Sequence, residues 1–420
     1  MGVRSAEPSD DLDRLDSAAG HRPKNPFLSR VCVRLRETRP LIPDAVGYTI
    51  RTEVVGGATF ARLWFRTSGC TRDRQGSCTF CNYGRGGPIH VDDMVSSVAQ
   101  GLAELSAACP ATLLVSPSGS MLDEIEVPAP ARRAILRLVA QTAAREVLFE
   151  TRAETVTDAN VRELAELMVG RSAQIEIGLE SSDPWIATYC VNKSLSLNDY
   201  RSAVRRINAQ GLGAITNAVI GIPFLSAREA VADAVRTVGW ALDQGSGSCA
   251  LFPLHVRGWT LLEWLWRRGM YQPPSLWSLV EVLHRLGPER AGRVTISWYR
   301  DYDAGVVDND DPTRPLASPT TCPRCRDTVL RLLDDYRATR DFAVVAQLAE
   351  MSCSCHDAWC LALDAPDGGT LVERVANAYA LIGRDVLGQP WWDAHGPAVI
   401  DGLTAGADRQ TSNVLPWAGA

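Results

Sequence analysis

The sequence predicts an α/β protein in which helices cover a parallel sheet, followed by a small cysteine-rich region. Six short hydrophobic runs alternate with amphipathic segments between residues 60 and 254, which is the pattern of consecutive βα units. A polar motif follows each of the first five runs, as expected where the carboxyl ends of parallel strands share one edge of a sheet. Cysteines gather in two groups, one after the first run and one after the sixth. The pattern is compatible with a doubly wound sheet and with an incomplete barrel.

Each predicted element has a local signal. Residues 60–65 form a hydrophobic first strand, and 91–107 is a helix because Val95, Val98, Leu102 and Leu105 share one face at helical spacing. The further strands are predicted at 111–115, 146–149, 174–178, 214–220 and 249–254. The further helices are predicted at 132–142 after prolines, at 158–168, at 197–210 before Gly211, and at the alanine-rich 227–242.

The composition is that of a globular protein with a sizeable core. The 420 residues are 46 % hydrophobic and 22 % charged. A formal charge of −6 and a pI of about 5.6 argue against non-specific binding of nucleic acid, which depends on clustered lysine and arginine. The N-terminal stretch has no apolar core, and no run of eighteen apolar residues exists, so we expect neither a signal peptide nor a membrane helix. We expect a cytoplasmic protein, in which grouped cysteines bind metal more often than they form disulfides.

The first cysteine group lies on the loop 68–85, directly after the first strand. Cys70, Cys78 and Cys81 place three thiolates within twelve residues, with no histidine among them. Three sulfur ligands that leave one position free fit a [4Fe–4S] cluster with an open iron best. A structural zinc site would normally be closed by a fourth ligand, and the next candidate is His90. The remaining alternative is a set of three unrelated buried cysteines.

The second cysteine group flanks a predicted helix at 328–336 and has the pattern CxxC…CxC. It consists of Cys322, Cys325, Cys353 and Cys355, with Cys360 as a further candidate. Four thiolates indicate an auxiliary [4Fe–4S] cluster, which we favour, or a four-cysteine zinc site. Zinc would make the region structural, whereas an iron–sulfur cluster is able to accept an electron, anchor a substrate or give up a sulfide. The isolated cysteines are expected in the core: Cys32, Cys109, Cys190 and Cys249.

These features resemble the radical S-adenosylmethionine (SAM) superfamily. That superfamily has a three-cysteine loop after the first strand of a partial barrel, although three residues usually separate its first two cysteines and this chain has seven. The elongator-type branch accepts the longer gap. Glu150-Thr-Arg152 and the run 177–182 of this chain also resemble that branch. Longer motifs resemble the radical SAM subunit of archaeosine biosynthesis over residues 50–360. These are SGSMLD at 118–123, GLESSD at 178–183, VNKS at 191–194, PFLS at 223–226, TLLEWLWRR at 260–268, YQPPSLW at 271–277 and the late CPRC…CSC pattern.

The resemblance implies a partial (βα)6 barrel of radical SAM type with a C-terminal cysteine-rich auxiliary-cluster domain. We expect four parts along the chain. They are a flexible N-terminal segment (1–45) of which 29–37 packs on the body, the barrel (46–300), the auxiliary-cluster domain (301–365), and a C-terminal helical segment with a polar tail (366–420). The last part should contain a helix near 371–387.

The resemblance also implies a reaction and a set of SAM contacts. In the superfamily three cysteines hold a [4Fe–4S] cluster whose fourth iron binds the amino and carboxylate groups of SAM, and reduction splits SAM into methionine and a 5′-deoxyadenosyl radical. Adenine is expected against Phe80 and the backbone of Tyr83 and Pro223, and the methionyl amino group at the turn of Ser118, Gly119 and Ser120. Arg152 suits the carboxylate, and Glu180 the ribose hydroxyls or the amino group. The alternative for Arg152 and Glu180 is a structural ion pair.

The resemblance leaves the substrate open. We favour hydrogen abstraction from a small nucleoside- or sugar-type substrate in natural-product biosynthesis, with sulfur insertion or electron transfer through the auxiliary cluster. The alternative is C–N cleavage of an amino-acid adduct on a deazaguanine in tRNA, and an inactive scaffold with structural zinc is a third reading. The aromatic segment 251–286 is either core or a flat pocket for a nucleobase-like substrate. The expected partners are a small molecule and an electron donor such as flavodoxin or ferredoxin, with tRNA only in the alternative and no membrane.

Overall fold

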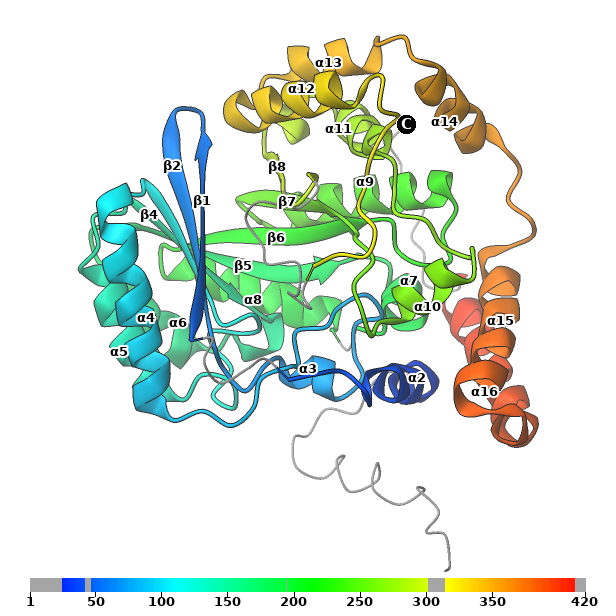
Figure 1. The fold of residues 1–420 in the computed structure, drawn as a ribbon, viewed down its shortest axis with the longest axis horizontal. Coiled ribbons are helices and arrows are strands. Elements are labelled where there is room, and N and C mark those ends of the chain that lie inside the picture. Colours follow the sequence, from blue (N-terminus) through cyan, green and yellow to red (C-terminus); the bar gives the residue numbers. More distant parts are fainter. Residues whose placement is uncertain (1–24, 42–46, 194, 301–313, 412–420) are drawn as a thin grey trace, which may run out of the picture.

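The computed structural model describes residues 25–41, 47–193, 195–300 and 314–411, and in it one sheet runs through the barrel (Figure 1). Neighbouring strands follow one another in chain order, which excludes the doubly wound arrangement. The first pair is antiparallel and every later pair is parallel. The strands are β1 (Tyr48–Val55), β2 (Ala58–Phe65), β3 (Thr112–Ser116), β4 (Glu146–Thr151), β5 (Ser172–Glu180), β6 (Gly213–Ile220), β7 (Ser248–Pro253) and β8 (Val294–Ile296).

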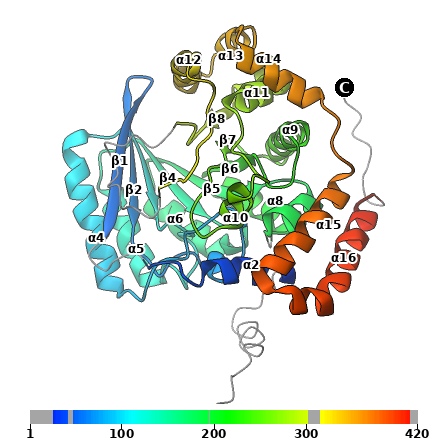
Figure 2. The same cartoon turned by 45° about the vertical axis from the view of Figure 1, so that its right-hand side comes forward.

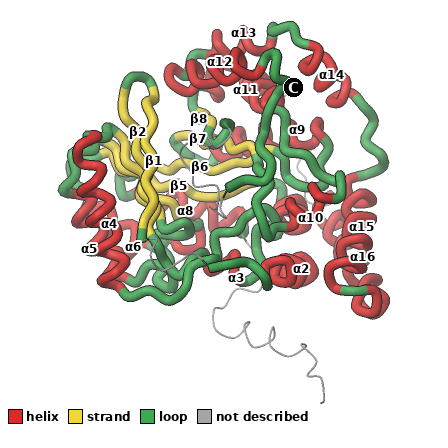
Figure 3. Tube along the Cα trace, viewed as in Figure 1, coloured by secondary structure: helices red, strands yellow, loops and turns green. Residues whose placement is uncertain are grey.

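Helices connect the parallel strands and cover the outer face of the curled sheet (Figure 3). They are α4 (Val91–Leu105), α5 (Ala129–Ala140), α6 (Asp158–Leu167), α8 (Leu197–Ala209), α9 (Ala227–Asp243) and α11 (Leu276–Ala291). Because side chains alternate along a strand, Val147 and Phe149 of β4 join the main core while Leu148 and Glu150 face the opposite side. The partial barrel predicted from the sequence is confirmed.

The six predicted strands correspond to β2 through β7, and two strands were not predicted. The strand β1 alternates polar and apolar residues in a hairpin with β2, and β8 has only three residues. Short elements complete the barrel: α3 (Thr71–Arg74), η1 (Ser106–Ala108), η2 (Ala153–Thr155), α7 (Pro184–Ile186), η3 (Ala187–Val191) and α10 (Leu261–Arg267). Within the described parts of the chain, no helix has the length and apolar character to cross a membrane.

The C-terminal region is entirely helical and forms two layers at different sides of the barrel (Figures 1 and 2). It contains α12 (Arg326–Thr339), α13 (Phe342–Ala349), α14 (Ser354–Asp364), α15 (Leu371–Ile382), η4 (Gly383–Leu387) and α16 (Gln389–Thr411). The helix expected near 371–387 is present. Where a polar tail was expected after it, the structure has the helix α16, which extends to residue 411. Helix α2 (Pro26–Arg36) packs its Phe27 ring on Tyr379 of α15, with centroids 4.6 Å apart.

Candidate active site

The cysteine loop leaves the carboxyl end of β2 and lines the inside of the half-barrel. Cys70 precedes α3, so this short helix occupies part of the long gap between the first two cysteines. Cys70, Cys78 and Cys81 all line a cavity of about 560 Å³. Burial raises the pKa of all three thiols, that of Cys78 to about 12. The metal-free thiols are therefore protonated, and metal binding must displace their protons.

The donor set of this loop fits an iron–sulfur cluster. Within the described ranges, one group of histidine, cysteine or acidic side chains is close enough together to hold a single metal ion. This group is the later set of four cysteines. Cys70, Cys78 and Cys81 line the cavity without forming such a single-ion group, which suits ligands to separate irons. Their role as ligands stays a prediction.

Arg152 lies next to the cysteine loop in a network of carboxylates. Its Nη1 is 2.6 Å from Glu126 Oε1 and 3.7 Å from Cys70 Sγ, and it also pairs with Asp123 and Glu154. Burial alone would lower the pKa of Arg152, but Glu126, Cys70 and Glu154 raise it overall. The guanidinium is thus permanently charged beside Cys70, a predicted cluster ligand, and is already ion-paired in the ligand-free protein.

Glu126 was missed by the sequence prediction, although it holds the site together. Its side chain is fully buried and accepts hydrogen bonds from the Thr71 amide (2.7 Å), the Thr71 hydroxyl (2.8 Å) and the Ser120 amide (2.6 Å). A Cβ atom on Gly119 would lie 2.1 Å from Glu126 Oε2, so a larger residue there would displace the carboxylate. The carboxylate therefore joins the cysteine loop to the turn after β3.

Glu180 and Lys193 form a second charged pair at the cavity, with Nζ 2.8 Å from Oε1. Glu180 has φ of 61° at the end of β5, a conformation that non-glycine residues adopt only at a cost. Burial lowers the pKa of Lys193, but Glu180 and Cys78 raise it overall. Lys193, which belongs to the quoted VNKS motif, was not predicted as a site residue.

Most of the predicted SAM contacts share the cavity, but two do not lie in its wall. The lining contains Phe80, Tyr83, Ser118, Gly119, Arg152 and Glu180. Ser120 and Pro223 are outside the lining, and the Ser120 hydroxyl lies 2.6 Å from Thr151 Oγ1 and 3.0 Å from Thr155 Oγ1. Ser120 thus serves the packing between the turns after β3 and β4.

A pair of glutamates lies deeper in the cavity. Glu150 of β4 and Glu176 of β5 are register partners on adjacent strands, and both line the cavity together with Arg62 and Asn217. Burial and the neighbouring Glu150 raise the pKa of Glu176 to about 8, and burial also raises the pKa of Glu150. At neutral pH Glu176 therefore keeps its proton and offers a donor next to the Glu150 carboxyl group. The period-2 alternation of polar residues on β5 could have revealed Glu176.

Replacing Glu176 with glutamine is expected to stabilise the protein at about pH 8 and to have little effect at about pH 4. The folded protein keeps a proton that the unfolded chain releases at the ordinary glutamate pKa, so the glutamate loses stability as the pH rises between the two values. The urea midpoint at the two pH values measures this, with exposed Glu166→Gln as the control. A lower midpoint for Glu176→Gln at pH 8 would contradict the raised pKa of Glu176.

The aromatic segment 251–286 divides between core and cavity. Trp264 and Trp277 are buried in the hydrophobic cores, as expected if the segment forms core. Phe252 and His255 line the cavity, and His255 Nδ1 lies 3.0 Å from Ser318 Oγ. Only the start of the segment therefore faces the candidate substrate space.

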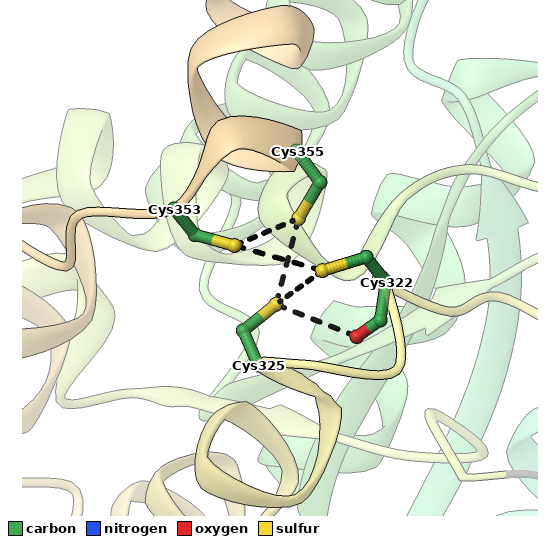
Figure 4. A group of neighbouring side chains, drawn as sticks. All are labelled: Cys322, Cys325, Cys353 and Cys355. Atoms are coloured by element: carbon green, nitrogen blue, oxygen red, sulfur yellow. Dashed lines mark hydrogen bonds between the residues drawn. The ribbon is translucent and has the colours of Figure 1, made fainter.

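The second cysteine group is assembled as the sequence predicted (Figure 4). Cys322 and Cys325 precede α12, and Cys353 and Cys355 begin α14, with neighbouring sulfurs 3.5–3.6 Å apart. The Trp277 indole N–H donates to Cys355 Sγ at 3.3 Å. Sulfurs this close together suit one tetrahedrally coordinated ion such as zinc, and the four thiols are also able to hold an auxiliary cluster. Cys360 is exposed and outside this group, and Cys109, expected in the core, is also exposed.

The fold and the two cysteine groups define a class of protein, the radical SAM enzymes of the elongator-type branch, which use a [4Fe–4S] cluster and SAM. Over 223 residues the chain is 30% identical to the archaeosine synthase subunit beta of Thermococcus kodakarensis, covering 52% of this chain and 68% of that protein. Within this class, the chain belongs to the family of the archaeosine synthase subunit beta.

A second relative and two solved structures are also similar. The archaeosine synthase subunit beta of Methanosarcina acetivorans is 27% identical over 323 residues, which cover 75% of this chain and 89% of that protein. The structure of Elp3 from Methanocaldococcus infernus has a TM-score of 0.43 at 16% identity, covering 59% of each chain. Methylornithine synthase (PylB) has a TM-score of 0.43 at 14% identity, covering 81% of this chain and 93% of its own. No protein-family model matches the chain.

Proposed function

We propose that the protein abstracts hydrogen from a small nucleoside- or sugar-type substrate held in the central cavity. The observation that carries the proposal is the composition of one continuous cavity wall. The three cysteine thiols, the Glu150–Glu176 pair and the Phe252 ring all face the same space of about 560 Å³. That volume is in the range of small-molecule sites.

Different residues of this chain are proposed to bind the cluster and SAM. Cys70, Cys78 and Cys81 are the proposed cluster ligands, and Arg152 is a fixed positive charge beside Cys70. When bound and reduced, the cluster supplies one electron that cleaves SAM and yields a 5′-deoxyadenosyl radical. Phe80 and Tyr83 line the same wall and are proposed to hold adenine, and Glu180 the ribose.

The glutamate pair supports a substrate with a polar edge. Because Glu176 keeps its proton at neutral pH, it offers an O–H donor next to the accepting oxygens of Glu150. A nucleobase edge has a donor and an acceptor side by side, and the Phe252 ring in the same lining is suited to stacking. These features favour a nucleoside over a plain sugar.

The second cysteine group is proposed to carry electrons or to insert sulfur after hydrogen abstraction. None of its four described cysteines lines the cavity. Electron transfer tolerates such a separation, whereas sulfur insertion requires the substrate radical to reach the cluster. Metal analysis after anaerobic purification tests the site. About eight irons per chain support two clusters, and about four irons with one zinc would make the group structural.

The second candidate function is the archaeosine-type reaction on a modified deazaguanine in tRNA. It is favoured by the name of the two relatives, archaeosine synthase subunit beta. The acidic chain, with a formal charge of −6, favours the small molecule. A gel shift with bulk tRNA at moderate salt separates the two, because a tight and salt-dependent complex supports the tRNA substrate and no complex supports the nucleoside.

Product analysis is the direct test of the proposed function. The anaerobic holoenzyme should form 5′-deoxyadenosine from SAM with dithionite, flavodoxin or ferredoxin as reductant. Addition of the correct nucleoside should accelerate this, and deuterium from a labelled nucleoside should appear in 5′-deoxyadenosine. Sulfur in the product would identify insertion. A panel of nucleosides that leaves the rate unchanged, with tRNA accelerating it, would overturn the proposal in favour of the alternative.

A further inference from the structure

Helix α2 reaches back to the cysteine loop through one arginine. Arg36 is buried, and its guanidinium donates to four backbone carbonyls of the loop. Nη1 lies 2.6 Å from the Asp73 oxygen, and Nη2 lies 3.1, 2.8 and 2.9 Å from the oxygens of Ser77, Cys78 and Cys81. Two of these carbonyls belong to proposed cluster ligands. A single planar cation thus fixes the backbone at both cysteines of the CxxC turn.

The loop needs this support because its backbone is strained and tightly packed. Cys78 has φ of 59°, which non-glycine residues adopt only at a cost. The Cys78 amide also donates to the Asn192 carbonyl at 3.3 Å, so both sides of the residue are held. At Gly76, with φ of 82°, a Cβ atom would lie 2.3 Å from the Ser29 carbonyl oxygen of α2. Helix α2 is therefore in direct contact with the loop.

On the side of the loop that faces α2, the charge is positive on balance. Asp73 Oδ1 lies 3.1 Å from Arg36 Nη2, and Asp73 Oδ2 lies 2.6 Å from Arg39 Nη1. Asp73 Oδ2 also accepts the Gly84 amide at 2.5 Å, and Arg39 Nη2 donates to the Gly84 carbonyl at 2.9 Å. Two buried guanidinium groups thus face one carboxylate, which leaves one net positive charge behind Cys78 and Cys81.

We propose that Arg36 is a positioning residue that fixes Cys78 and Cys81 for the cluster and whose charge favours the reduced cluster. This rests on the proposed role of the three cysteines. When an external donor such as dithionite passes one electron to the cluster, the cluster gains one negative charge. A fixed cation behind its ligands stabilises that state, because little solvent screens a buried pair. The gap between Cys70 and Cys78 is longer than is usual in the superfamily, so more loop backbone has to be held in place. This makes such support necessary.

The test compares three full-length variants after anaerobic reconstitution with iron and sulfide. Arg36→Gln removes the charge and most of the contacts, whereas Arg36→Lys keeps the charge. Arg34→Gln is the matched control, because Arg34 lies on the same helix, is exposed and pairs only with Glu37 in the described structure. Two properties are measured: the rate of iron loss to a chelator, and the midpoint potential of the cluster from an electron paramagnetic resonance titration.

We expect both Arg36 variants to lose iron faster than wild type and Arg34→Gln to match it. Arg36→Gln should lower the reduced-to-oxidised ratio at a fixed potential about tenfold, which is about 59 mV for a one-electron couple. Arg36→Lys should keep the wild-type midpoint potential. If Arg36→Gln holds no cluster, the potential of Arg36→Lys tests whether the charge favours the reduced cluster. Wild-type iron retention and potential in Arg36→Gln, or a tenfold fall in Arg36→Lys, would overturn the proposal. A wild-type protein that binds no cluster would instead refute the proposed function.

Discussion

Replacing Cys78 with alanine is expected to abolish the formation of 5′-deoxyadenosine. Two remaining thiols cannot complete the three-ligand site, and the cluster has no fourth protein ligand to fall back on among those predicted. The iron content should fall by about four per chain while the second cysteine group keeps its metal. The measurement is chromatographic detection of 5′-deoxyadenosine after anaerobic incubation with SAM and dithionite, together with iron analysis.

The matched control for this result is Cys109→Ala. Cys109 is exposed and belongs to neither group, so its loss should change neither the iron content nor the product yield. A single-cysteine control is needed because twelve cysteines offer many routes to non-specific damage. If Cys78→Ala still forms 5′-deoxyadenosine at the wild-type rate, Cys78 is not a cluster ligand.

Much of the barrel was predictable because its signals are local. Each strand from β2 to β7 is a short hydrophobic run, and each crossover helix has apolar residues at helical spacing, so neighbouring residues suffice to identify them. The strand β8 escaped because three residues do not establish a pattern. The order of the strands was also undetermined, since local patterns do not say which strands pair.

The residues of the candidate site were predictable only where a short sequence motif indicates their chemistry. Cysteine spacing identified both sulfur groups, because few other roles require grouped thiols in one segment. Arg36 contacts carbonyls that lie 37 to 45 residues further along the chain, so nothing near it in sequence indicates its partners. Glu126 likewise meets Thr71 and Arg152 only after the strands align. Supporting residues of this kind are defined by the folded structure.

Glu126→Ala is expected to be the most destabilising single change in the site. It removes a fully buried carboxylate that accepts from the Thr71 amide, the Ser120 amide and Arg152 Nη1, the last at 2.6 Å. Two buried amides then lose their acceptor, and Arg152 loses one of its partners. Leaving a buried donor without an acceptor costs about 1–3 kcal/mol, and this loss comes from the amides, because Arg152 keeps its other carboxylate partners.

The free energy of unfolding from urea titration of the metal-free protein measures this loss. Glu124→Ala is the control, because its side chain is 64% exposed and its contact with Arg132 is 3.6 Å long, so a change below about 0.5 kcal/mol is expected. Asp123 and Glu154 still pair with Arg152 in the Glu126→Ala variant, so the charge itself stays near Cys70. The damage should therefore appear as loosening of the cysteine loop, seen as faster hydrogen exchange at the Thr71 and Ser120 amides. Equal unfolding free energies for the two variants would show that Glu126 does not join the loop to the turn after β3, and that the cysteines are held by the α2 side alone.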